Sequence, residues 1–245
     1  MLRELKAGLL MMTVMTAITG LVYPVFITAI AQAAFREQAN GSLVTANGQV
    51  IGSRLIGQSF SKPEYFHPRP SAAGTGYDPT SSGGTNLGPT SAKLFNGTIK
   101  VDDRKNEVVD FDGIKDRIVH YCVENSIPFQ SSRPLAGFRD ARGNLDDVAL
   151  IKAFNDEKSP LTVVPGVALP ADAVTSSASG LDPHISPGNA ELQAARVANA
   201  RGVSVEQVQA VVARHTEPRT FGFLGEPVVN VLELNLALDD EFHRK

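Results

Sequence analysis

The feature that most constrains this chain is a long apolar stretch near its start, residues 7–35, which contains no charged side chain. A helix needs about 20 apolar residues to cross the hydrocarbon core of a bilayer, and this stretch is longer than that. Charged residues bracket it, with Arg3 and Lys6 before it and Arg36 and Glu37 after it. The sequence therefore predicts one membrane-spanning helix over residues 7–35.

A cleaved signal peptide is the alternative interpretation of this segment. Ala31 and Ala33 match the small-x-small pattern that signal peptidases cut after. The apolar core of a signal peptide runs for about 7 to 15 residues, whereas this one is far longer. We therefore expect a retained anchor, while a cleaved and secreted protein would begin near Ala34.

The positive charges around the predicted helix indicate its orientation. Arg3 and Lys6 precede it, whereas Arg36 is nearly alone after it. Because Lys and Arg are enriched on the cytoplasmic side of membrane helices, the N-terminus is expected inside. Residues 1–6 would then be cytoplasmic, and residues 36–245 would form a domain outside the cytoplasm.

Small and hydroxylated residues form a narrow stripe on the predicted helix, because Thr13, Thr16, Thr19 and Gly20 recur at three- to four-residue spacing. Such stripes allow close packing between membrane helices, so the stripe predicts contact with another membrane protein. The alternative is that lipid-facing helices simply tolerate these residues.

Composition excludes several classes of function. The formal net charge of -3 lacks the basic excess that binding to a nucleic acid backbone requires. Cys122 is the single cysteine, so it cannot form a disulfide within the chain, and it is expected to be buried. The five histidines and this cysteine show no zinc-ligand spacing, so no metal site is expected.

Beyond the membrane segment, residues 52–89 are rich in Gly, Pro, Ser and Thr but also carry aromatic and aliphatic side chains. This mixture predicts loops docked onto a folded core rather than a free linker. Residues 99–161 change to dense charge and are interpreted as an accessory insertion. Within them we expect a helix around residues 114–119 and another over 145–154, capped by Asn144.

The last third of the chain carries the clearest local signals. Ser186 followed by proline predicts the start of a helix over 187–201, which ends at Gly202. Ser204 and Gln207 form a capping box that opens a second helix.

Four leucines then alternate with other residues over 232–238, and this period of two predicts a half-buried strand. Helices followed by a strand, without a repeating βαβ pattern, indicate a mixed α/β (α+β) domain.

We find no catalytic motif in the sequence. The glycine-rich run at residues 81–88 lacks the lysine of a phosphate-binding loop and is interpreted as a turn. Ser179 resembles a nucleophile elbow, but the glycine two residues before it is missing. Asp182 and His184 flank a proline, where they are expected to bond to turn backbone groups.

Five blocks of residues, taken in order along the chain, resemble the small C subunit of the bacterial potassium-transporting Kdp ATPase, which is a P-type pump. The resemblance covers the anchor, residues 50–90 and residues 164–240, but not 99–161. The blocks are GSxLIGQ (52–58), YFHxRPSA (65–72), SGGxNL (82–87), VTxSASGLDxxISP (174–187) and VNVLxLNLAL (229–238).

The resemblance implies a non-catalytic accessory subunit in the inner membrane. Its expected partners are a potassium-channel-like subunit, the P-type ATP-hydrolysing subunit and membrane lipid. The family is described as a catalytic chaperone that promotes ATP use, so ATP is a possible shared ligand. That implication conflicts with the predicted orientation, because ATP is cytoplasmic and a domain outside could act on it only indirectly.

Two functional hypotheses follow. In the first, the helix packs against the channel-forming partner and the outer domain covers the ion entrance, where Asp78, Asp182 and Glu226 gather cations. In the second, the chain is an anchored extracytoplasmic hydrolase that uses Ser179 and His184.

Overall fold

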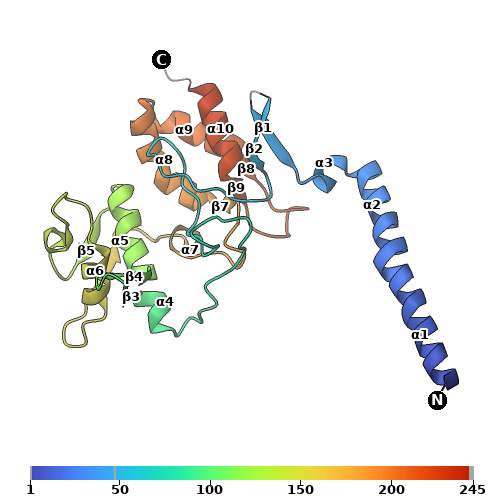
Figure 1. The fold of residues 1–245 in the computed structure, drawn as a ribbon. Coiled ribbons are helices and arrows are strands. Elements are labelled where there is room, and N and C mark those ends of the chain that lie inside the picture. Colours follow the sequence, from blue (N-terminus) through green and yellow to red (C-terminus); the bar gives the residue numbers. More distant parts are fainter. Residues whose placement is uncertain (1, 47, 243–245) are drawn as a thin grey trace. The chain divides into compact units, whose positions relative to one another are not determined.

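A computed structural model describes residues 2–46 and 48–242 (Figure 1). The chain forms two compact units, one ending at Leu55 and the other beginning at Ile56. The second unit combines helices with short antiparallel strands. The fold is therefore a mixed α/β structure with one N-terminal helix that could span a membrane, as the sequence predicts.

The first unit begins with a continuous helix, Leu2–Ala34, long and apolar enough to cross a bilayer. It consists of α1 (Leu2–Ala17), a π-helical turn η1 (Ile18–Val22) and α2 (Tyr23–Ala34). The π turn ends at Val22, two residues before Pro24, which has no N–H to donate within the helix. A wider turn accommodates this lost bond without ending the helix.

After this helix come a single turn, α3 (Arg36–Ala39), and a hairpin of strands β1 (Leu43–Ala46) and β2 (Gln49–Ser53). The two strands pair antiparallel, with a bulge between Val44 and Thr45. These elements belong to the same unit as the long helix, and the sequence signal for the hairpin was the Asn-Gly pair at 47–48, which is typical of tight hairpin turns.

The second unit contains the remaining elements, which group into a middle region and a C-terminal region (Figure 1). Its helices are α4 (Ala92–Asn96), α5 (Ile114–Glu124), α6 (Asp147–Phe154), α7 (Ala171–Val174), α8 (Pro187–Arg201), α9 (Val205–Arg214) and α10 (Val231–Glu241), with a 3-10 turn η2 (Leu135–Phe138). Its strands are β3 (Thr98–Val101), β4 (Glu107–Phe111), β5 (Phe129–Ser131), β6 (Val163–Pro165), β7 (His184–Ile185), β8 (Thr216–Glu217) and β9 (Val228–Asn230).

Helices α8, α9 and α10 and the three-stranded sheet β7-β9-β8 enclose the largest core. The predicted caps are confirmed: the Ser186 hydroxyl accepts the N–H of Asn189, and Gly202 ends α8 in the left-handed conformation. Ser204 and Gln207 form the expected capping box of α9. The core is made of the ring of Phe66 and of aliphatic residues from the three helices and from β7 and β9, among them Ile185, Val197, Val208, Leu234 and Leu238.

The predicted strand over 232–238 is wrong, because these residues form helix α10. The Asn230 side chain accepts the N–H of Glu233 and caps the helix, and Leu, Glu and Ala are strong helix formers. Val231, Leu234 and Leu238 are spaced three and four apart and point into the core. Of the alternating leucines, Leu234 and Leu238 lie on this helical face, whereas Leu236 is only partly buried.

The middle region has cores of its own. Helix α5 lies where the sequence predicts it, and Cys122 on this helix is buried as expected. Val119 packs with Leu150 and Phe154 of helix α6. The predicted cap of α6 is wrong by two residues, because the carboxylate of Asp146 accepts the N–H of Ala149, so the helix starts after Asp146 rather than Asn144.

The segment 56–91, rich in turns, is docked onto the C-terminal helices, which confirms the prediction for this part of the chain. The ring of Phe66 is completely buried. The side-chain amide of Asn235 pairs with both backbone groups of Phe66, and that of Gln193 pairs with both backbone groups of His67. Two side chains thus replace the strand partner that this segment lacks.

Candidate functional site

Arg69 and Asp182 are the centre of the junction between the docked segment and the turn before α8. Arg69 Nη1 donates to Asp182 Oδ2 at 3.0 Å, and its other nitrogens donate to the carbonyls of Thr175 and Ser176. The Tyr77 hydroxyl donates to the carbonyl of Arg69 at 2.7 Å. The predicted motif residues around 69 and 182 therefore meet in space, and they hold backbone together.

Asp182 also fulfils the turn role expected of it. Its Oδ1 accepts the backbone N–H of His184 at 3.0 Å. Burial raises the pKa of Asp182, but the hydrogen bonds from His184 and Arg69 outweigh burial, and the net pKa is lowered. The carboxylate therefore stays ionised and satisfied by its neighbours.

The three predicted cation-gathering acids do not form one cluster. Asp182 and Glu226 border a shared depression of about 380 Å³, together with Asp172. Asp78 is not among its lining residues and instead accepts the N–H and hydroxyl of Thr80 in its own turn. The other two acids also have partners. Asp182 pairs with the guanidinium of Arg69, and Glu226 pairs with that of Arg219.

Ser179 and His184 do not form a nucleophile–base pair among the contacts of the described residues. The Ser179 hydroxyl accepts the N–H of Leu181 and lies 3.3 Å from the Ser177 hydroxyl. The carbonyl of Ser179 accepts the N–H of Gly83. Ser179 thus stabilises the junction of two turns.

A second cavity, of about 330 Å³, lies between the docked segment and helix α5. His67 borders it and contacts Glu124 of α5, with 2.7 Å between Nδ1 and Oε1. Arg196 reaches the carbonyls of Pro63 and Tyr65 nearby. The polar residues that line this cavity come from parts of the chain that are far apart in sequence. The sequence therefore did not predict the cavity.

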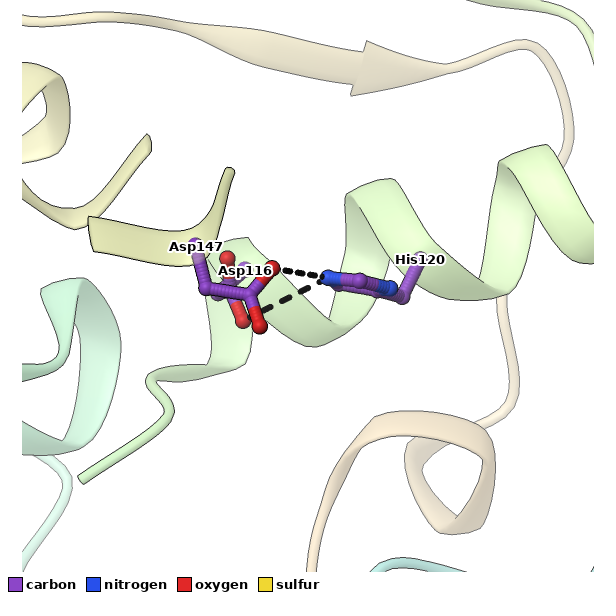
Figure 2. Close-up of side chains that lie close together, drawn as sticks. All are labelled: Asp116, His120 and Asp147. Atoms are coloured by element: carbon purple, nitrogen blue, oxygen red, sulfur yellow. Dashed lines mark hydrogen bonds and ion pairs between the residues drawn. The ribbon is translucent and has the colours of Figure 1, made fainter. Parts of the chain in front are cut away.

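The sequence analysis also did not predict a cluster of three titratable side chains, Asp116, His120 and Asp147. Asp116 and His120 stand one turn apart on α5, and Asp147 opens helix α6 opposite them (Figure 2). His120 Nε2 lies 2.7 Å from Asp147 Oδ1 and 3.9 Å from Asp116 Oδ2. The spacing of Asp116 and His120 was visible in the sequence, but Asp147 joins them only through packing of α6 on α5.

An exposed apolar loop connects β8 to β9. Phe221, Phe223 and Leu224 project from it, and the two rings are 84% and 69% exposed. A bridge between Thr220 and Leu224 closes the loop. Large side chains grouped in this way on a surface mark a contact site. The sequence signal was the close spacing of two phenylalanines and a leucine.

The long N-terminal helix, Leu2–Ala34, has no buried residue. On it, the hydroxyls of Thr13 and Thr19 donate to the carbonyls of Leu9 and Met15. These internal bonds satisfy polar groups that would be costly to expose to lipid. Thr16 and Gly20 lie about one helical turn apart on the same helix.

The sequence of this chain is similar to that of a known protein family. The chain matches the sequence model of the family described as "KdpC: K+-transporting ATPase, c chain" over residues 5–119 and 144–240. Part of the predicted insertion, residues 120–143, is left unmatched by it.

Relatives align over nearly the whole chain. The potassium-transporting ATPase KdpC subunit of Koribacter versatilis is 45% identical over 239 residues, covering 98% of this chain and 95% of the relative. The subunit of the same name from Mycobacterium tuberculosis is 42% identical, covering 98% and 99%. That from Caulobacter vibrioides is 42% identical over 243 residues, covering 99% and 95%. The chain therefore belongs to the KdpC family, the c chain of the K+-transporting ATPase.

Proposed function

We propose that this chain, as the accessory KdpC subunit of the K+-transporting ATPase, stabilises the assembled complex and promotes ATP use by its hydrolysing subunit. The observation that carries the proposal is a helix of membrane-spanning length with its entire surface free, in a family defined by a multisubunit transporter. The absence of a catalytic motif in the sequence fits an accessory role.

We further propose that the helix is a retained anchor with residues 1–6 inside and residues 36–245 outside the cytoplasm. Arg3 and Lys6 on the N-terminal side support this orientation. The domain would then influence ATP use indirectly, through the helix and the channel-like partner. Direct contact with ATP requires the opposite orientation.

Labelling of single cysteines in intact cells separates these two arrangements. In a Cys122→Ser background, Ala213→Cys places a thiol on an exposed position of α9 that has no capping role. Leu2→Cys places a thiol at the N-terminal end of the membrane helix, on the side opposite to the domain. We expect a membrane-impermeant maleimide to label position 213 in intact cells and position 2 only after lysis. The reverse pattern would place the domain in the cytoplasm, where direct contact with ATP is possible. A mature chain that begins near Ala34 would show that the helix is cleaved and is not an anchor.

Two surfaces are proposed to dock onto the other subunits. One is the stripe of Thr13, Thr16, Thr19 and Gly20 on the membrane helix, which permits close helix packing. The other is the apolar loop with Phe221, Phe223 and Leu224, whose exposed rings provide the apolar anchors that protein interfaces favour.

Substitution in the loop tests the second surface. Phe223→Ser is expected to reduce co-purification of the other subunits with this chain, because it removes an exposed ring without touching the core. Val101→Ser is the matched control, since Val101 is similarly exposed at the end of β3. Equal recovery of the complex with both variants would remove the loop from the interface.

Gathering of cations by Asp78, Asp182 and Glu226 is the remaining part of the proposal. Their negative charge would raise the local potassium concentration near an ion entrance. We expect Asp78→Asn combined with Glu226→Gln to raise the potassium concentration needed for half-maximal ATPase activity. An unchanged value would discard this role.

A further inference from the structure

Helix packing in the middle region brings three ligand-type side chains together. Asp116 and His120 are four residues apart on α5 and share one face of the helix. Val119 on the same helix packs against Leu150 and Phe154 of α6, which fixes the start of α6 beside α5. The three groups offer ligand atoms that all lie within 4.8 Å of one another.

Asp116 is the unusual member of this cluster. Its side chain is only 4% exposed, and its Oδ1 has no hydrogen-bond partner among the described residues. The guanidinium of Arg117 is committed to Asp112, with contacts of 2.8 and 2.9 Å. Burial raises the pKa of Asp116 to about 7. A buried carboxylate with one unpartnered oxygen is costly, and a bound cation would compensate for it.

The distances in the cluster are close to those between the ligands of a metal ion, although His120 and Asp147 stand at hydrogen-bond distance without one. Ligand bonds of about 2.0–2.2 Å in a tetrahedral site place ligand atoms roughly 3.3–3.6 Å apart. His120 Nε2 lies 2.7 Å from Asp147 Oδ1 and 3.9 Å from Asp116 Oδ2, so the two distances fall on either side of that range. Small side-chain rotations would equalise them. The carboxylates of both aspartates face the imidazole (Figure 2).

The donor set indicates the class of ion. Calcium and magnesium prefer ligand sets made only of oxygen, whereas an imidazole with two carboxylates suits zinc and neighbouring divalent transition metals. His120 and Asp147 are 46% and 42% exposed, which leaves a fourth position open to water and provides an entry path.

We propose that Asp116, His120 and Asp147 form a site for one divalent transition-metal ion of the zinc type, which ties α5 to the first turn of α6. The ion replaces the proton that His120 donates to Asp147 and neutralises the buried carboxylate. Because a metal that binds only the folded protein stabilises it, the site would strengthen the middle region of the domain. This site is independent of the proposed docking surfaces and of the orientation in the membrane.

Zinc binding to the full-length chain in detergent, purified without a polyhistidine tag and stripped with a chelator, tests the proposal. Competition with a chromogenic zinc chelator measures affinity, and circular dichroism measures the melting temperature with and without Zn²⁺. We expect one Zn²⁺ per chain and a higher melting temperature in its presence. Asp147→Asn and His120→Gln are expected to weaken binding by at least about tenfold and to abolish the thermal shift.

Both variants change exposed side chains, so folding of the stripped protein should be preserved. Glu124→Gln is the matched control, because Glu124 lies on the same helix and contacts an imidazole at 2.7 Å without a third ligand. It should bind Zn²⁺ like the unaltered chain. The proposal is overturned if the unaltered chain binds no Zn²⁺, or if Asp147→Asn and His120→Gln bind it equally well.

Discussion

The side-chain amide of Asn235 makes both of its described hydrogen bonds to Phe66, accepting the N–H at 2.8 Å and donating to the carbonyl at 3.0 Å. Asn235 belongs to α10, whereas Phe66 belongs to the docked segment, 56–91. This single side chain therefore satisfies the backbone of a loop residue whose ring is in the core. It explains how a segment without regular structure is held in a fixed place.

Asn235→Leu should release this part of the docked segment. The leucine fills a similar volume but leaves the N–H and carbonyl of Phe66 without partners, and each unsatisfied buried group costs about 1–3 kcal/mol. Urea unfolding should show the lower stability, and hydrogen exchange should show faster exchange at Phe66. Unchanged exchange at Phe66 would mean that the amide pair does not hold the loop.

Gly180→Ala should destabilise the junction of the two turns. Gly180 has a φ of +67°, and a Cβ there would lie 2.6 Å from the Gly83 carbonyl oxygen and 2.7 Å from the Ala73 nitrogen. The left-handed conformation alone costs about 1–2 kcal/mol for a residue with a side chain. Gly83→Ala is the control, since its Cβ would meet nothing within 4 Å. Thermal unfolding of both variants should separate them; equal melting temperatures would contradict the packing described here.

Leu234→Ala and Leu236→Ala distinguish helix α10 from the strand that the sequence predicted. In a strand both leucines would lie on the same buried face. In the helix Leu234 is fully buried, whereas Leu236 is only partly buried. We therefore expect Leu234→Ala to cost about 2–5 kcal/mol and Leu236→Ala clearly less. Similar losses in the free energy of unfolding would favour the strand.

The Arg69–Asp182 ion pair should make stability depend on pH. Because the pKa of Asp182 is lowered from 3.8 in the folded chain, ionised Asp182 stabilises the fold above that value. The contribution is lost as the pH falls through the lower, folded pKa. The stability difference between the unaltered chain and Asp182→Asn should thus be large at neutral pH and shrink below 3.8. Urea unfolding across pH checks this, and a difference independent of pH would show that the charge is not involved.

Local signals in the sequence were reliable where the chain's own neighbours decide the conformation. Ser186, Gly202 and the Ser204–Gln207 box act within one helical turn, so helices α8 and α9 could be placed from the sequence. The alternation over 232–238 was ambiguous because burial on one side is compatible with both a helix and a strand. Only the cap at Asn230 and the packing of Leu234 and Leu238 decided it.

The sequence by itself determined a helix long and apolar enough to cross a membrane, the caps of α8 and α9, and the family, because these depend on length, on short-range bonding and on ordered blocks of residues. The tertiary structure alone decided which distant groups meet. It placed Asp78 outside the depression that Asp182 and Glu226 border, and it brought Asp147 to Asp116 and His120. The physical reason is that such contacts depend on how helices pack, and helix packing follows from the whole core rather than from any local pattern.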